Sequence, residues 1–173
     1  GNKFGIAHER TLLTYQRAAA LPGLKVVGID CHIGSQITTT APYLDALDKV
    51  LELVAQLKKE GIEIHHLDLG GGLGISYGDD NPPDITEFTN TLLNRVAERG
   101  FAHLDVVLEP GRSLVGNAGV LLTKVEYLKP GTEKNFCIVD AAMTELMRPA
   151  LYEAYHGIVP VQTKQVASST YDI

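Results

Sequence analysis

The stretch Leu67-Asp68-Leu69-Gly70-Gly71-Gly72-Leu73-Gly74 decides the fold, because it joins the end of a predicted strand directly to a glycine-rich loop. The predicted strand is the mostly apolar run 62–69, which has the length of a strand rather than of a helix. Glycines let the backbone approach a ligand closely and point several N–H groups at an anion. We therefore interpret Gly70, Gly71 and Gly72 as a phosphate-binding loop, with a flexible turn as the alternative.

Helices are predicted on both sides of this loop. Apolar residues repeat every three to four positions over 41–60 and 85–99, and a weaker pattern of the same kind covers 8–20. Asp84 stands where an N-cap is needed for the helix at 85–99. Gly61 follows the helix at 41–60 and predicts its end.

Strands alternate with these helices. Apolar runs of strand length occupy 24–29 and 104–108 in addition to 62–69. Such runs are typical of parallel strands that are covered on both faces. Strand and helix recur about every 40 residues, which is the arrangement of βα units. The first part of the chain is therefore predicted to be an α/β structure with a parallel sheet.

The pattern changes after Leu114. The stretch 120–128 is rich in β-forming residues, Lys129-Pro130-Gly131 predicts a turn, and 135–139 predicts a second strand. Adjacent strands joined by a short turn pair in antiparallel fashion. We therefore divide the chain into a partial α/β barrel at 1–114 and the start of a mostly antiparallel β domain at 115–173.

The composition excludes several classes of protein. The 173 residues carry 15 basic and 21 acidic side chains, a formal net charge of −6, without a basic patch that would favour nucleic acid. No apolar run reaches the roughly 20 residues that span a bilayer. Only two cysteines are present, Cys31 and Cys137, which favours a reducing compartment. We expect a cytoplasmic protein that binds neither nucleic acid nor membrane.

Three chemically distinctive clusters follow the three predicted strands. His32-Ile33-Gly34-Ser35 follows the first strand, the glycine loop follows the second, and Glu109-Pro110-Gly111-Arg112 follows the third. Chemistry in βα barrels gathers at the carboxyl ends of the strands, so we predict that the clusters form one site. Structural interpretations remain open: His32 also fits a core histidine, and Ser35 a turn residue. Glu109 and Arg112 also fit a local ion pair.

A metal site is not predicted. His65 and His66 are neighbours on a strand and therefore face opposite sides, which is poor geometry for a shared metal ion. The same alternation argues against Cys31 and His32 as a nucleophile and its base.

The chain resembles the diaminopimelate decarboxylases, which are pyridoxal-phosphate enzymes built from a barrel and a β domain. The resemblance runs in order over nearly the whole chain and is carried by four stretches: Gly28-Ile29-Asp30-Cys31-His32-Ile33-Gly34-Ser35-Gln36, Leu67–Gly74, Glu109–Gly119 and Met147–Tyr152. It implies the C-terminal part of a (β/α)8 barrel that binds pyridoxal 5′-phosphate, followed by the start of the β domain.

The resemblance also implies a role for each cofactor-binding residue. His32 would stack on the cofactor ring, and Glu109 would hydrogen-bond the pyridine nitrogen and keep it protonated. A protonated ring is an electron sink for the charge left when CO₂ departs. The phosphate would be held by the following residues: Ser35, Gly70, Gly71, Gly72, Pro110, Gly111 and Arg112.

Substrate contacts are implied for Arg112, Arg148 and Tyr152, which would bind the distal carboxylate of the substrate. A guanidinium group presents two parallel donors, which suit a carboxylate better than a lysine ammonium does. From the residues alone, an Arg-Pro pair such as Arg148-Pro149 in a β-domain loop is usually structural.

By the same resemblance, the full-length parent would convert meso-2,6-diaminopimelate to L-lysine and CO₂ as a homodimer with shared active sites. Its Schiff-base lysine would precede Gly1, and a cysteine-containing loop would follow Tyr171-Asp172-Ile173. We therefore expect the 173-residue fragment to lack activity by itself. The alternatives are a related ornithine or arginine decarboxylase, a barrel racemase, a non-catalytic homologue, and a barrel enzyme that binds only a phosphorylated metabolite.

Overall fold

The computed structural model describes residues 4–162 and 169–173, and they form two compact units. The first unit comprises Gly1–Ile75 and Asn81–Gly116, and the second comprises Ser76–Asp80 and Asn117–Ile173. The predicted division into 1–114 and 115–173 stays a prediction; residue 114 falls inside the short helix α4 (Gly111–Val115) of the first unit.

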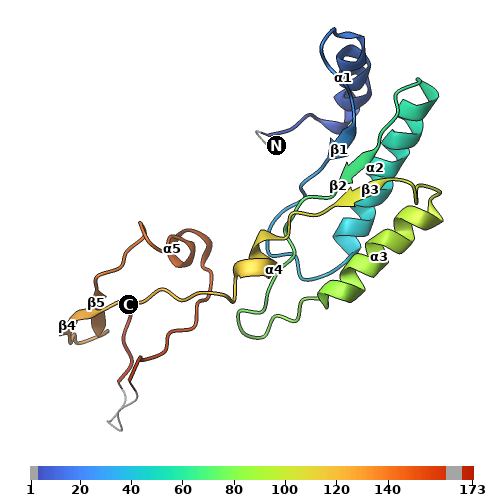
Figure 1. The fold of residues 1–173 in the computed structure, drawn as a ribbon. Helices are drawn as coiled ribbons and strands as arrows, with labels where there is room; N and C mark the ends of the chain where they lie inside the picture. The colour runs from blue at the N-terminus through green and yellow to red at the C-terminus, as the bar shows by residue number, and fades with distance from the viewer. Residues whose placement is uncertain (1–3, 163–168) are drawn as a thin grey trace. The chain divides into compact units, whose positions relative to one another are not determined.

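The first unit contains three parallel strands in the order β1-β2-β3. They are β1 (Gly28–Asp30), β2 (His66–Asp68) and β3 (Asp105–Val107), and the register places Ile29, Leu67 and Val106 side by side. A helix lies between successive strands in the chain, as expected for βα units (Figure 1).

The helices are α1 (His8–Ala20), α2 (Ala41–Lys59) and α3 (Ile85–Glu98), close to the predicted bounds. The Asp84 carboxylate accepts hydrogen bonds from the backbone N–H groups of Thr86 and Glu87 at 2.8 and 3.1 Å, which confirms the N-cap of α3. Gly61 follows α2 with a φ of +76°, a conformation that favours glycine at the end of a helix.

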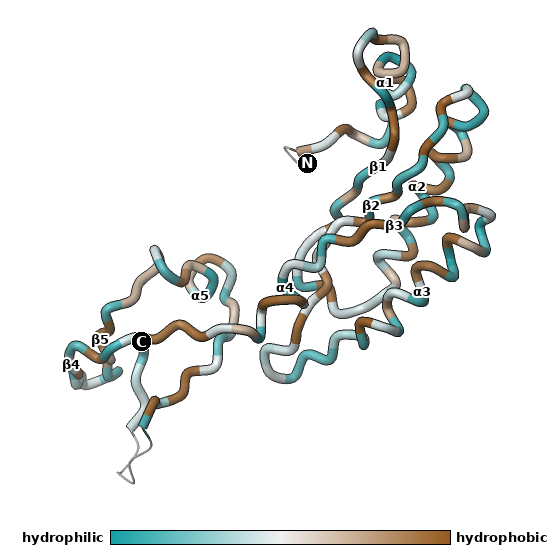
Figure 2. The backbone as a smooth tube through the Cα atoms, viewed as in Figure 1, coloured by the Kyte–Doolittle hydropathy of each residue, from teal (hydrophilic) through white to brown (hydrophobic). Residues whose placement is uncertain are grey.

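The apolar faces of α2 and α3 pack together against the sheet (Figure 1). Hydrophobic and hydrophilic residues alternate along both helices, which is the pattern of a helix buried on one side (Figure 2). The largest fully buried side chains come from both helices and from β2: Leu47, Leu51, Leu57, Leu67 and Leu92. This core holds the strand ends in place.

The strands are shorter than the apolar runs that predicted them. The carbonyl of Val27 accepts hydrogen bonds from both His65 and His66, so the regular ladder begins only after this irregular point. Beyond the strands, the Cys31 N–H donates to the backbone carbonyl of Asp68, and the Leu69 N–H donates to the backbone carbonyl of Val107. Backbone pairing therefore continues into the loops at the carboxyl ends of the strands.

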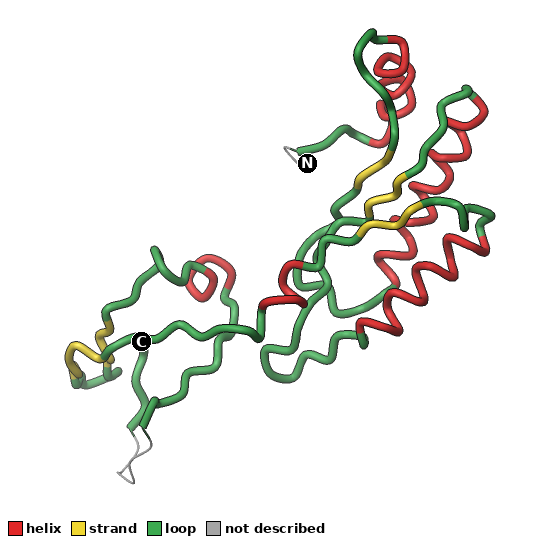
Figure 3. The backbone as a smooth tube through the Cα atoms, viewed as in Figure 1, coloured by secondary structure: helices red, strands yellow, loops and turns green. Residues whose placement is uncertain are grey.

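The second unit is mostly loop around an antiparallel pair of strands, β4 (Val125–Lys129) and β5 (Phe136–Val139), with the short helix α5 (Arg148–Tyr152) (Figure 3). The antiparallel pair and its turn are confirmed. Residues 120–124 are not a strand, and the Lys124 N–H donates to the Asp140 carboxylate at 2.8 Å. Within the described residues, every helix is too short or too polar to cross a membrane.

Candidate active site

The loops that follow β1, β2 and β3 meet at one edge of the sheet. The Glu109 N–H donates to the carbonyl of Gly70 at 2.8 Å, which joins the third loop to the second. The Gly71 N–H donates to Nδ1 of His32 at 3.4 Å, which joins the second loop to the first. The clusters predicted at the three strand ends are therefore neighbours in the folded chain.

The glycine triplet is required by this close approach of backbones. An added Cβ at Gly71 would overlap the carbonyl oxygen of Glu109, and one at Gly72 would overlap the carbonyl oxygen of Gly34. Gly70 and Gly72 also have φ values of +67° and +96°, a region in which side chains are strained. The triplet thus places bare backbone between two neighbouring loops.

Side chains hold the glycine loop in position. The Asp68 carboxylate accepts a hydrogen bond from the Gly70 N–H at 2.8 Å. The buried Tyr43 hydroxyl donates to the carbonyl of Gly71 at 3.0 Å. The N–H groups of Gly70 and Gly71 are thus directed at Asp68 and His32.

A side-chain hydrogen bond joins the outer two loops. One terminal nitrogen of Arg112 donates to the Ser35 hydroxyl at 3.0 Å. The pair joins a positive charge and a hydroxyl group from positions far apart in the sequence. A guanidinium, a hydroxyl and bare glycine backbone are the donors that a phosphate group requires.

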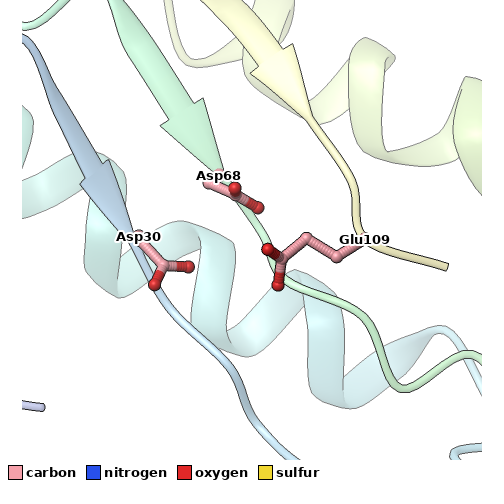
Figure 4. A group of neighbouring side chains, drawn as sticks. All are labelled: Asp30, Asp68 and Glu109. Atoms are coloured by element: carbon pink, nitrogen blue, oxygen red, sulfur yellow. The ribbon is translucent and has the colours of Figure 1, made fainter. Parts of the chain in front are cut away.

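Three carboxylates gather beside the glycine loop: Asp30, Asp68 and Glu109 (Figure 4). One oxygen from each lies within 4.8 Å of the others. Such a concentration of negative charge favours a cation, either a metal ion or a protonated ring nitrogen.

Glu109 was predicted from the sequence as a site residue, whereas Asp30 and Asp68 were not. Asp30 and Asp68 each end a strand, and the parallel register pairs them directly. Their position as the last residue of consecutive strands is the signal that could have identified them. The predicted absence of a metal stays a prediction.

Cys31 follows Asp30 directly in the chain and is partly buried. Burial, and then the nearby charges of Asp30 and Asp68, raise the pKa of its thiol from 9.0 to about 11. The thiol therefore stays protonated near neutral pH, which argues against Cys31 as a nucleophile.

Arg148 and Tyr152 belong to the second unit, where they begin and end α5. Tyr152 is 70% exposed, whereas Arg148 is partly buried. The Arg148 guanidinium lies 3.2 Å from Nε2 of His156 and 5.1 Å from the centre of the Tyr77 ring. His156 and Tyr77 were not predicted from the sequence, since no local pattern links either position to Arg148. The structure thus unites the candidates of the first unit, and the roles of Arg148 and Tyr152 stay predictions.

Known proteins are similar to this chain in sequence and in structure. The family model described as "Pyridoxal-dependent decarboxylase, pyridoxal binding domain" matches residues 1–116. A diaminopimelate decarboxylase of Neisseria meningitidis serogroup B is 54% identical over 172 residues, which cover 99% of this chain and 41% of the relative. The chain therefore spans about two fifths of the length of this relative.

Solved structures match the described fold. The crystal structure of AQ1208 from Aquifex aeolicus has a TM-score of 0.85 and 43% identity, and covers 98% of this chain and 41% of the matched chain. A diaminopimelate decarboxylase from Helicobacter pylori, complexed with L-lysine, has a TM-score of 0.85 and 34% identity. The match covers 95% of this chain and 40% of the matched chain. Because the family model covers most of the chain, and sequence relatives and structural neighbours agree with it, the chain belongs to the pyridoxal-dependent decarboxylases.

Proposed function

We propose that these residues form the cofactor-phosphate site of a diaminopimelate decarboxylase, and that the complete protein containing them converts meso-2,6-diaminopimelate to L-lysine and CO₂. The observation that carries the proposal is the meeting of three strand-end clusters at one edge of the sheet. The proposal is supported by the family match over residues 1–116 and by the names of the relatives.

The residues at this edge fit pyridoxal 5′-phosphate. The phosphate carries a double negative charge, which suits the Arg112 guanidinium and the Ser35 hydroxyl. Gly72 adds bare backbone next to them, where a side chain would overlap Gly34. The backbone of Pro110 and Gly111 completes the proposed phosphate site, because these residues connect Glu109 to Arg112.

The other end of the cofactor would lie beside the acidic cluster. When bound, pyridoxal phosphate supplies an electron-withdrawing ring that accepts the electron pair left by the departing CO₂. Glu109 would accept a hydrogen bond from the ring nitrogen and hold the proton there. Asp30 and Asp68 add negative charge at the same place, which favours the protonated ring.

His32 would place its imidazole against the face of the ring. Its Nδ1 accepts the Gly71 N–H, so the proton of the neutral imidazole belongs on Nε2 and the ring has a defined orientation. Arg112, Arg148 and Tyr152 would bind the distal carboxylate of the substrate. This carboxylate separates diaminopimelate from ornithine and arginine, the substrates of the related decarboxylases.

We propose in addition that the complete protein acts as a cytoplasmic homodimer with shared active sites. The support is the resemblance of the sequence to the family. Light scattering on the purified complete protein would give the mass of a dimer, and a monomer with full activity would contradict shared active sites.

Turnover of competing amino acids tests the proposed activity. The complete protein, loaded with pyridoxal phosphate, should release CO₂ from meso-diaminopimelate and not from ornithine or arginine. Glu109→Gln should lower kcat by about 100-fold, because the ring nitrogen loses the carboxylate that keeps it protonated. Glu133→Gln, which changes an exposed turn residue in the second unit, is the matched control and should retain activity.

Two results would overturn this proposal. Preferred turnover of ornithine or arginine would assign the chain to a related decarboxylase. A complete protein that binds pyridoxal phosphate without any turnover would favour a non-catalytic homologue. The 173 residues alone should release no CO₂ above background, and measurable release would contradict the proposal that the Schiff-base lysine lies outside them.

A further inference from the structure

Arg148 has two neighbours that the proposed chemistry does not use. We call Tyr77, Arg148 and His156 the arginine cluster; all three belong to the second unit. Arg148 begins α5, His156 follows this helix in the chain, and Tyr77 comes from the distant segment Ser76–Asp80. Two side chains, those of Tyr77 and His156, thus converge on one guanidinium group.

The contacts restrain the guanidinium from two sides. One terminal nitrogen of Arg148 lies 3.2 Å from Nε2 of His156, within hydrogen-bond distance. The guanidinium carbon lies 5.1 Å from the centre of the Tyr77 ring, which is cation–π geometry. The two aromatic rings also touch each other, with centroids 5.4 Å apart and planes at 72°. Each member of the cluster therefore contacts both of the others.

This arrangement leaves most of the hydrogen-bonding capacity of Arg148 unused by His156. A guanidinium has five N–H donors in a planar fork, and the imidazole nitrogen accepts only one of them. The fork can still bind a carboxylate through two parallel hydrogen bonds. Since an exposed arginine has many rotamers, contacts that select one of them before binding strengthen the binding of a carboxylate.

Tyr77 also connects the arginine cluster to the glycine loop along the chain. Tyr77 is two residues after Ile75, whose backbone is bonded at both N–H and carbonyl by the Gln36 side chain, at 3.3 and 2.6 Å. The chain is thus held at Ile75, two residues before Tyr77.

We propose that Tyr77 and His156 are positioning residues that hold the Arg148 guanidinium ready for the carboxylate that the substrate retains after decarboxylation. This inference rests on the proposed function and makes the cluster a determinant of specificity for amino acids with a distal carboxylate. Diaminopimelate loses one carboxylate and L-lysine keeps the other, so substrate and product present the same group to Arg148. Cadaverine, the diamine without any carboxylate, presents none.

The test compares disruptive and conservative variants of the complete protein loaded with pyridoxal phosphate. Tyr77→Leu removes the aromatic face and Tyr77→Phe keeps it. His156→Leu removes the hydrogen-bond acceptor, and His156→Gln restores an acceptor near the position of Nε2. Calorimetry gives the Kd of L-lysine and of cadaverine, and CO₂ release gives KM and kcat for diaminopimelate.

The two leucine variants should raise the KM for diaminopimelate and the Kd of L-lysine by about tenfold, with little change in kcat. The Kd of cadaverine should not change, because the variants loosen only the Arg148 guanidinium and cadaverine has no carboxylate for it to bind. Tyr77→Phe and His156→Gln should stay within about twofold of the unchanged protein. A conservative variant that fails to restore the affinity for lysine would contradict the assigned contact.

Other outcomes separate this inference from the proposed function. The inference is wrong, even when the enzyme is active, if both leucine variants leave the Kd of L-lysine unchanged. It is also wrong if they weaken the binding of L-lysine and of cadaverine equally. If the unchanged protein does not decarboxylate diaminopimelate, the proposed function fails, and the ratio of lysine to cadaverine affinity still tests the cluster. Should one leucine variant fail to fold, the variant at the other position decides.

Discussion

Replacing Gly72 by alanine should damage both the stability of the first unit and the phosphate site. The backbone of Gly72 has a φ of +96°, and an added Cβ would overlap the carbonyl oxygen of Gly34 and lie 3.1 Å from the Tyr43 hydroxyl. The overlap involves backbone, so it cannot be relieved by rotating a side chain. Either the loop after β1 or the glycine loop must move.

The magnitude has two parts. The left-handed backbone conformation costs a residue with a Cβ about 1–2 kcal/mol. Forcing a methyl group into a filled space adds about 1–3 kcal/mol. We therefore expect Gly72→Ala to lower the free energy of unfolding by about 2–5 kcal/mol.

Gly100→Ala is the matched control. Gly100 has a φ of +82°, and an added Cβ there would meet no atom within 4 Å. It should therefore show only the conformational cost of about 1–2 kcal/mol. The difference between the two variants isolates the steric effect of the close approach between neighbouring loops.

Urea unfolding followed by far-UV circular dichroism measures both variants in the complete protein. Absorbance titration with pyridoxal phosphate then measures cofactor affinity, which should fall by about tenfold or more for Gly72→Ala and stay unchanged for Gly100→Ala. Equal loss of stability in the two variants, or unchanged cofactor affinity in Gly72→Ala, would refute the assigned role of the triplet.

Three further predictions concern the ion pair between α2 and α3, the thiol of Cys31 and the hydroxyl of Tyr43. Asp48→Asn weakens a partly exposed ion pair of 2.6 Å with Arg95 and should cost about 1 kcal/mol in urea unfolding, with a smaller loss in molar salt; a loss independent of salt would argue against the ion pair. Cys31 should react with iodoacetamide at pH 8 about 100-fold more slowly than a thiol of pKa 9.0, because its pKa of about 11 leaves little thiolate. Asp30→Asn should raise this rate, as peptide mass spectrometry would show, and an unchanged rate would contradict the contribution of the Asp30 charge. Tyr43→Phe removes the hydroxyl that holds the glycine loop and should cost about 1 kcal/mol in the same urea assay, whereas full stability would contradict the hydrogen bond.

The helices were predicted closely because their signals are local. The apolar stripe of α2, the Asp84 cap of α3 and the glycine after α2 each act within a few residues. The strands were predicted in place and order but were too long, because the irregular bonding at Val27 depends on a neighbouring strand. The strand expected from residue 120 begins only at Val125, after the Lys124 N–H has bonded to the side chain of Asp140.

The candidate site was only partly predictable. His32, the glycine loop and Glu109 stand out because they follow strands directly. The partners that hold them do not stand out: Tyr43 lies on a helix face that reads as core, and Asp68 reads as part of a strand. His156 and Tyr77 carry no local signal at all, since their contact with Arg148 exists only after distant segments fold together.

By itself, the sequence determined the βα order of the first unit, the helix ends and the three clusters at the strand ends. These features follow from periodicity, capping and chain direction, which are properties of neighbouring residues. Only the tertiary structure shows why three glycines are needed, because the backbones of Cys31, Glu109 and Gly34 in adjacent loops leave no room for a Cβ at Gly70, Gly71 and Gly72. It also decided which carboxylates gather beside Glu109, because parallel register pairs Asp30 with Asp68. Contacts between strands depend on register and packing across long sequence distances, and no local pattern encodes them.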